Sequence, residues 1–288
     1  GRFMSEYGFQ GMPPLESIEK FTVVADRQLG SEVMEVHQKH PRGTELIDTY
    51  MKRDYRIPES FGRYIYVSQL LQAEGIKTAI EAHRRNMPRC MGTLYWQLND
   101  CWAVTCWLSV DYYGNWKALH YFVKDAYSEV LVSPVIEEEK IKIHVISDRQ
   151  DSINASLAFK ITRFNGEVLG RKTIDFNING PQSFVAFETE LNSLIRGFKK
   201  EDIVLMAEIR EKNAPLSRNL LYFEKPKNLN LPPGKPEIAV EESPNGYLIR
   251  ITSKSLIKNI AFSHSQIDGH FDKNFFDIPP RDTVEVQF

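Results

Sequence analysis

The hydrophobic pattern of this chain changes its period near Pro134, and this change constrains the fold more than any other feature. Before it, residues 60–86 carry apolar side chains at helical spacing, with charged residues between them. After it, residues 140–145 alternate apolar and polar side chains, as half-buried strands do. We therefore expect a helix-rich N-terminal region followed by a C-terminal region made of β-sheets.

The N-terminal region, residues 1–133, has the pattern of two βα units. Short apolar runs at residues 3–6 and 91–96 predict strands. The helical pattern of residues 60–86 follows the first run, and a second amphipathic pattern at residues 116–129 follows the other. An excursion at residues 31–53 is long enough to be a functional loop.

The C-terminal region has the pattern of two small β domains joined by a stiff linker. Residues 134–224 contain about six short runs of alternating residues, and Asn165-Gly166 is a hairpin turn signal, which together predict an immunoglobulin-like sandwich. Residues 225–236 are rich in proline and predict a linker, and residues 237–288 predict a second small β-sandwich. The expected strands are 140–145, 157–161, 174–178, 184–187, 203–209, 220–223, 238–240, 247–251, 257–262 and 284–288.

The charge balance disfavours several classes of partner. The 288 residues carry a net charge of −2, which leaves no electrostatic footprint for nucleic acid or an anionic membrane surface. No apolar run reaches the roughly 18–20 residues of a membrane span. No glycine-rich phosphate loop is present, so we expect no nucleotide cofactor.

The cysteines and histidines favour structural roles. The 3 cysteines, Cys90, Cys101 and Cys106, lack the spacing of a disulfide framework and are expected to be buried free thiols. His37 and His40 lack an accompanying cluster of carboxylates or cysteines, so a polar helix end or site entrance is favoured over a metal site.

Three further titratable residues are also expected to be structural. Lys117 is predicted to pair with a nearby carboxylate and His120 to pack on its helix. His144 is predicted to face outward from its strand.

Glu6 is the strongest candidate for chemistry. The apolar run before it delivers this carboxylate into a turn that contains Gly8 and Gly11, as a barrel strand delivers a catalytic acid to the open end of the barrel. Taken alone, a glutamate in this position is more often a solvated surface group.

Residues 94–102 hold a second set of candidate residues. Trp96 and Trp102 offer indole faces on which sugar rings stack, while Asn99 and Asp100 offer groups that bind hydroxyls. On composition alone, the alternative of two core indoles and a capping turn is favoured.

Together these stretches resemble a known family. Residues 2–10 (RFMSEYGFQ) and 92–102 (GTLYWQLNDCW) resemble the β-mannosidases of glycoside hydrolase family 2. Residues 111–121 are similar to the last barrel helix of that family, and residues 269–277 resemble a motif in its final β domain. These motifs extend over nearly the whole chain, and their combination is specific.

The resemblance implies the C-terminal part of a (β/α)8 TIM barrel, its last two βα units, followed by two immunoglobulin-like domains. It implies that Glu6 is the nucleophile after the seventh strand and that Trp96 is the aromatic floor of the sugar site. Asn99, Asp100 and Trp102 match the pattern at the edge of that site. Ala103 departs from it, since many members have proline there, which affects the expected loop shape rather than the reaction.

A retaining glycosidase needs two carboxyl groups about 5–5.5 Å apart. In the family that this chain resembles, the acid/base is a glutamate preceded by asparagine, and no Asn-Glu dipeptide occurs in this sequence. The resemblance therefore implies that an N-terminal part of the same enzyme supplies the acid and the other barrel strands. We expect the chain alone to be inactive, with exposed barrel surface through which it could form homo-oligomers.

The leading functional hypothesis is a retaining exo-β-mannosidase that acts on β-mannoside glycans without a cofactor. The alternatives are a β-galactosidase or β-glucuronidase of the same family, or a non-catalytic carbohydrate-binding or scaffold module. An extracytoplasmic bacterial location is favoured over a lysosomal one.

Overall fold

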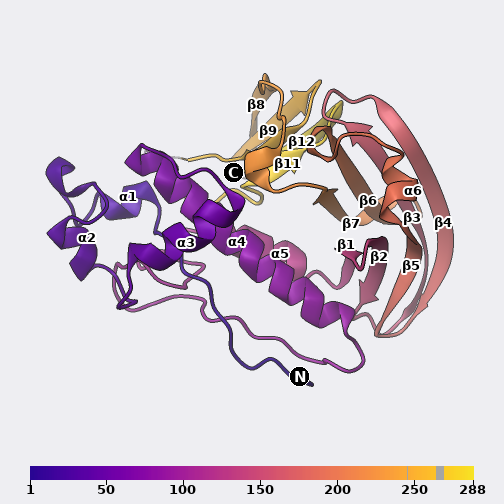
Figure 1. The fold of residues 1–288 in the computed structure, drawn as a ribbon, viewed down its shortest axis with the longest axis horizontal. Coiled ribbons are helices and arrows are strands. Elements are labelled where there is room, and N and C mark those ends of the chain that lie inside the picture. The colour runs from indigo at the N-terminus through magenta and orange to yellow at the C-terminus, as the bar shows by residue number, and fades with distance from the viewer. Residues whose placement is uncertain (245, 264–268) are drawn as a thin grey trace.

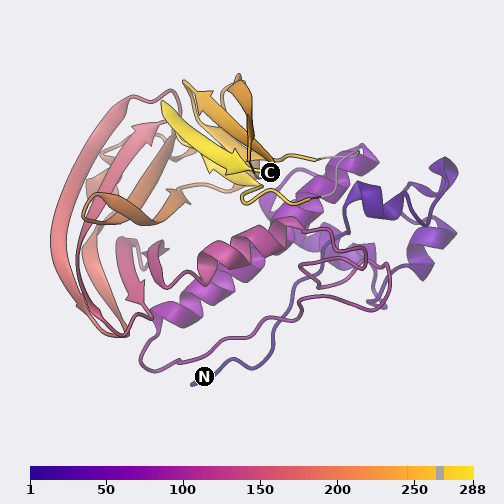
Figure 2. The same ribbon diagram turned by 180° about the vertical axis from the view of Figure 1, so that it is seen from behind.

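The computed structural model describes residues 1–244, 246–263 and 269–288. It consists of an N-terminal helical region followed by two immunoglobulin-like β-sandwich domains (Figure 1). The N-terminal helices lie on one side of the molecule and the larger sandwich on the other, and the C-terminal domain contacts both (Figure 2). Within the described residues, no helix is both long enough and apolar enough to span a bilayer.

The helical region is organised around one long helix. The predicted helix at residues 60–86 is confirmed as α4 (Phe61–Arg85), and the second predicted helix is confirmed but shorter, as α5 (Ala118–Ala126). The excursion at residues 31–53 holds α2 (Glu32–Val36) and most of α3 (Thr44–Asp54). A short helix α1 (Leu15–Ile18) and a 3-10 turn (Val24–Asp26) precede them.

Helix α4 is buried on opposite faces, which explains its length. Tyr64 and Leu71 pack into a cluster with Ile47 and Met51 of α3. Another cluster joins α4 to α5, where the buried side chains are Leu70, Ala73, Ile76, Ile80, Ala118, Leu119, Val123 and Ala126. Because apolar side chains recur with the helical period on both faces, α4 connects the helical layers into one core.

The predicted strands at residues 3–6 and 91–96 are not regular strands, and this part of the prediction is wrong. These segments meet only at isolated parallel bridges, Met4 with Thr93 and Gly8 with Trp96. The two segments bond to each other along one edge. Among the described residues, no strand pairs with the outer edge of either segment. A parallel pair without further neighbours does not form the continuous ladder of a sheet.

The first sandwich consists of two antiparallel sheets, ordered β1-β2-β5 and β4-β3-β6-β7. Inward-facing side chains such as Ile143, Leu157 and Leu205 are fully buried between them. All of the expected strands of this domain form, although their bounds differ. The strands are β1 (Val130–Glu137), β2 (Lys140–Ser147), β3 (Ser152–Arg163), β4 (Val168–Asn179), β5 (Gln182–Glu190), β6 (Ile203–Glu211) and β7 (Ala214–Tyr222).

Strand β1 was not predicted, and it crosses the boundary expected at residue 134. Pro134 lies inside this strand, opposite Ile143. Proline is tolerated there because β1 is at the edge of its sheet, where a missing N–H removes no ladder bond on the outer side. A short helix α6 (Leu191–Ile195) and a 3-10 turn (Lys200–Asp202) join β5 to β6.

The C-terminal domain is a smaller pair of sheets. Strands β8 (Glu237–Ser243), β9 (Gly246–Ser253) and β12 (Asp282–Gln287) form one sheet, and β10 (Ile257–Ile260) and β11 (Phe276–Ile278) form the other. The four expected strands are present, and β11 was missed. A 3-10 turn (Pro226–Asn228) begins the segment that joins the two β domains.

Helix α4 is attached to the first sandwich by a buried polar network. Glu81 of α4 accepts hydrogen bonds from Ser133 of β1 and Asn219 of β7, at 2.6 and 2.9 Å. Arg84 donates to the carbonyl of Ala126 and to Asp148, at 2.6 and 2.8 Å. The helical region and the sandwich are therefore joined through directional bonds as well as through apolar contact.

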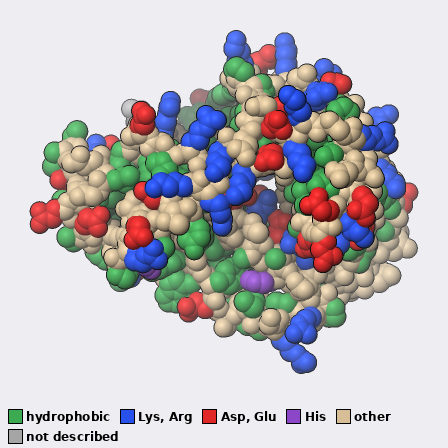
Figure 3. Space-filling view, in the orientation of Figure 1, with side chains coloured by type: hydrophobic (Ala, Val, Ile, Leu, Met, Phe, Trp, Pro, Cys, Tyr) green, Lys and Arg blue, Asp and Glu red, His purple; other side chains and the backbone are tan. Residues whose placement is uncertain are grey.

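Charged side chains of both signs lie on the face of the molecule that Figure 3 shows. Hydrophobic side chains also reach the surface along the lower edge of this view, where residues 2–8 and 91–96 run in Figure 1. In these two segments, Phe3, Met91, Leu94 and Trp96 are 48–61% exposed.

Candidate functional site

Two extended segments run side by side and carry the main candidate residues. The amides of Met4 and Leu94 donate to the carbonyls of Gly92 and Met4, at 2.9 and 2.8 Å. Further along, the Trp96 amide donates to the Tyr7 carbonyl at 2.7 Å. We call residues 2–8 and 91–96 the parallel pair. It brings Glu6 and Trp96, which are far apart in the sequence, to the same end of two neighbouring segments.

Glu6 lies near the end of the first segment, with an exposed side chain. No hydrogen bond or ion pair to its carboxylate is found among the described residues. The backbone on either side of it is bonded to the other segment, through Met4 and Tyr7. The carboxylate is thus free to meet a ligand while its backbone is held.

The loop after Glu6 is packed tightly against the rest of the helical region. A Cβ on Gly8 would lie 2.7 Å from the Trp107 side chain, and one on Gly11 would lie 2.6 Å from Gln72. Gln72 of α4 donates to the Phe9 carbonyl at 2.7 Å. A side chain at either position would therefore force Trp107 or Gln72 to shift.

Trp96 and Asn99 are open to solvent. Trp96 is 48% exposed, and its peptide bond with Gln97 is cis. Gln97 donates to the Asn99 carbonyl at 2.6 Å, which leaves the exposed Asn99 amide group outside this bond. The indole face and the amide suit a sugar ring and its hydroxyls.

Asp100 has a different environment. Its carboxylate accepts hydrogen bonds from Lys39 at 2.7 and 2.9 Å, and from the Cys101 amide at 2.8 Å. Burial raises the pKa of Asp100, but the bonds from Lys39 and Cys101 outweigh it and hold the pKa below its usual range. Asp100 thus ties the loop after Trp96 to the excursion, rather than presenting a free carboxylate.

The excursion at residues 31–53 places two histidines near the tryptophans that follow Trp96. His37 stacks on Phe21 with ring centroids 4.0 Å apart and approaches Trp102 at 5.6 Å. Its Nδ1 lies 2.5 Å from the Ala103 carbonyl oxygen. His40 lies edge-on to Trp107 at 6.1 Å. Sequence reasoning did not pair these histidines with the tryptophans, because the segments are far apart in the chain and only tertiary packing joins them.

Sequence reasoning also missed a partly buried polar cluster that includes Tyr7, the residue after Glu6. Tyr7 and Thr93 share a hydrogen bond of 2.7 Å, and His83 of α4 lies 2.8 Å from the same Thr93 hydroxyl. Tyr127 donates to the Thr93 carbonyl at 2.7 Å. Burial raises the pKa of Tyr7 and lowers that of His83. The adjacency of Tyr7 to Glu6 was the only available signal.

Two expectations about single residues are wrong. Lys117 does not pair with a carboxylate in the described part of the chain. It is fully buried and donates to the Gly11 carbonyl at 2.8 Å. Cys101 is exposed, whereas Cys90 and Cys106 are buried, and all of these described cysteines carry free thiols. Cys101 is exposed because it follows Asp100 in a surface turn that Lys39 holds in place.

His120 packs as expected. Its ring lies 4.4 Å from that of Trp116, and its Nδ1 is 3.2 Å from the Ser109 hydroxyl. No group of three or more histidine, cysteine, aspartate or glutamate side chains gathers as a metal site within residues 1–244, 246–263 and 269–288.

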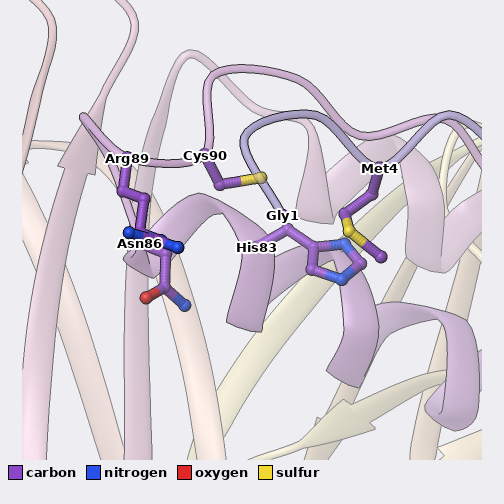
Figure 4. A pocket seen from close by; sticks show the side chains of 6 residues that line it. All are labelled: Gly1, Met4, His83, Asn86, Arg89 and Cys90. Atoms are coloured by element: carbon purple, nitrogen blue, oxygen red, sulfur yellow. The ribbon is translucent and has the colours of Figure 1, made fainter.

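Two cavities lie at the other end of the parallel pair. The smaller, of about 120 Å³, is lined by Gly1, Met4, His83, Asn86, Arg89 and Cys90 (Figure 4). The larger, of about 590 Å³, is open and is lined by Arg2, Pro88, Arg89 and Met91. Neither lining includes Glu6 or Trp96, and both of these side chains are exposed.

Comparison with known proteins identifies both β domains. Residues 139–228 match the model of the mannosidase Ig/CBM-like domain, and residues 234–288 match an Ig-fold domain model. A crystal structure of β-D-mannosidase from Dictyoglomus thermophilum superposes on 99% of the chain with a TM-score of 0.92 and 30% identity. The chain covers 35% of that protein.

Two curated relatives are also β-mannosidases. Beta-mannosidase A of Neosartorya fischeri is 25% identical over all of this chain, and that of Emericella nidulans is 26% identical. The chain spans only 35% and 34% of the lengths of these proteins. The exo-chitosanase of Amycolatopsis orientalis shares the fold, with a TM-score of 0.79 at 13% identity.

Proposed function

Since this chain corresponds to the C-terminal portion of a β-mannosidase of glycoside hydrolase family 2, we propose that it carries the nucleophile of a retaining exo-β-mannosidase. Glu6 attacks the anomeric carbon of a terminal β-mannosyl residue and displaces the aglycone, whose oxygen takes a proton from the acid/base residue. Water then hydrolyses the covalent glycosyl intermediate and releases the Glu6 carboxylate. Trp96 stacks against the sugar, and Asn99 binds its hydroxyls.

One observation carries this proposal. The parallel pair brings the carboxylate of Glu6, free of protein partners among the described residues, to the segment that ends in the exposed indole of Trp96. A nucleophilic carboxylate beside an aromatic platform is the arrangement that a glycosidase needs. Asp100 and Trp102 act at the rim, where Asp100 positions the loop through Lys39.

The parallel pair forms part of a (β/α)8 barrel whose other strands and acid/base come from polypeptide outside residues 1–288. Phe3, Leu94 and Trp96 expose apolar side chains on it, and barrel interiors are filled by such side chains from neighbouring strands. Chain 1–288 alone is therefore expected to leave aryl β-mannosides uncleaved. Measurable turnover by a purified sample of the chain would contradict this.

Glu6→Gln in the intact enzyme tests the nucleophile. The amide cannot form the covalent intermediate, so kcat on an aryl β-mannoside should fall by at least about a thousandfold while folding is preserved. A panel of β-mannoside, β-galactoside and β-glucuronide substrates on the unaltered enzyme identifies the sugar. Near-normal turnover by Glu6→Gln would remove Glu6 from the mechanism.

A second candidate function is a non-catalytic carbohydrate-binding module. The observation that favours it is the match of residues 139–228 to a domain model described as CBM-like. Titration of chain 1–288 with mannan separates the two functions. Saturable binding that survives Glu6→Gln and Trp96→Ala would assign the affinity to the β domains.

A further inference from the structure

We propose that Lys117 is the positioning residue that holds the loop after Glu6 in its active conformation. This inference rests on the proposed role of Glu6 as nucleophile. Lys117 directly precedes α5 and is distant from Gly11 in the sequence. Its ammonium nevertheless donates a hydrogen bond to the carbonyl of Gly11 at 2.8 Å. The loop from Gly8 to Gly11 is therefore fixed by a residue that lies outside the parallel pair.

The contacts of this loop show where Lys117 acts. Gly8 forms a bridge with Trp96 at one end of the loop, and the Gly11 amide donates to the Cys106 carbonyl at 3.2 Å at the other. Gln72 bonds to both the Phe9 and the Cys106 carbonyls. Lys117 supplies the bond to the Gly11 carbonyl at the end of the loop. The backbone near Glu6 is thus held at Tyr7 by the parallel pair and at Gly11 by Lys117.

The placement of Lys117 is costly for a residue with a purely structural role. Lys117 is fully buried, and no ion pair to it is found in the described residues. It is also the N-cap residue of α5, where the helix dipole disfavours a cation. Asp111 and Cys106 are the titratable groups that face it, and the oxygens of Asp111 are already bonded to Ser17, Tyr113 and Asn115. Burial lowers the pKa of Lys117 to about 7.

A methionine would fill the same space without the cost of burying an amine. We therefore infer that the role of the amine is its hydrogen bond to the Gly11 carbonyl. That bond joins the loop after Glu6 to the segment that follows Trp96, since the Lys117 amide also donates to the Ser109 carbonyl at 2.9 Å. Lys117 thus adds to the bonds of Gln72 and of the Gly11 amide, which also join the two sides of the proposed sugar site.

Hydrogen exchange on chain 1–288 tests the contact without requiring activity. In Lys117→Met, the amides of Gly11 and Met12, which donate to Cys106 and Ser68, should exchange about tenfold faster after correction for global unfolding. Leu119→Ala is the matched control because Leu119 is fully buried on the same helix but has no bond to the loop. Unchanged exchange in Lys117→Met would overturn the inference.

Kinetics on the intact enzyme test the consequence. Lys117→Met should lower kcat by about 10- to 100-fold through misplacement of Glu6, with KM within about twofold, while Leu119→Ala lowers stability and leaves kcat unchanged. A loosened loop with normal kcat would also overturn the inference. Retained turnover in Glu6→Gln would instead refute the proposed function, and the exchange experiment distinguishes that failure from this one.

Discussion

At the scale of single residues, some candidate side chains have no protein partner among the described residues, whereas others form hydrogen bonds that position the loops. Glu6 and Trp96 are exposed, whereas Asp100 and Lys117 are committed to Lys39 and to Gly11. The sequence motif identified Glu6, Trp96, Asn99, Asp100 and Trp102 as one set. The structure divides this set, because a carboxylate that already accepts bonds from an ammonium and an amide is less available to a ligand.

The buried amine of Lys117 predicts a pH dependence of stability. Its pKa is about 7 in the folded chain, against an ordinary value of 10.5, so the unfolded chain binds more protons between these pH values. The free energy of unfolding should therefore rise as pH increases from about 7 to 10.5, by at most about 5 kcal/mol. Denaturant unfolding of the native chain and Lys117→Met across this range measures the difference. Equal slopes in the two proteins would show that Lys117 titrates normally.

At the scale of helices and strands, the polar attachment of α4 to the first sandwich is the notable feature. His144 of β2 faces outward from the sandwich core, as predicted, but α4 packs over this face. Neither ring nitrogen of His144 has a hydrogen-bond partner among the described residues. The outward face of β2 is therefore buried under α4. The alternating sequence pattern could not reveal this, because such a pattern shows only which residues share a face.

His144 predicts a loss of stability in acid. Burial, with a smaller contribution from Arg85 of α4 and from Lys142, lowers its pKa from 6.5 to about 4, while Glu137 opposes the shift. The unfolded chain binds more protons between these values, so the free energy of unfolding should fall by up to about 3 kcal/mol as pH drops from 6.5 to 4.

His144→Phe should remove that acid dependence and raise stability at pH 5, measured by urea unfolding. His270→Gln serves as the control because His270 is exposed. If the acid slope persists in His144→Phe, another group is responsible.

At the scale of the whole molecule, the apolar side chains of the parallel pair remain uncovered. Leu94 is 54% exposed there. We expect the isolated chain to self-associate through this surface, and Leu94→Glu should shift it toward the monomer in sedimentation velocity. Val36→Glu, in α2 and 63% exposed, is the matched control and should leave the association unchanged. A monomeric native chain at micromolar concentration would contradict this prediction.

The sequence by itself determined the elements whose apolar side chains recur with one clear period. Helix α4 and the strands β2–β7 follow from local pattern, because a helix or a half-buried strand needs apolar residues at a fixed spacing whatever its neighbours are. The resemblance of residues 2–10 and 92–102 to one family also came from the sequence alone. Strand β1 and the irregular parallel pair were not foreseen, because regular pairing depends on which segments lie beside each other.

Only the tertiary structure decided which candidate residues meet and which are free. Asp100 bonds to Lys39, Trp102 lies near His37, and Lys117 reaches Gly11, and each of these contacts joins segments that are distant in the chain. Sequence spacing carries no information about such contacts. They form where helices and loops pack together, and it is the packing that buries an amine or leaves a carboxylate exposed.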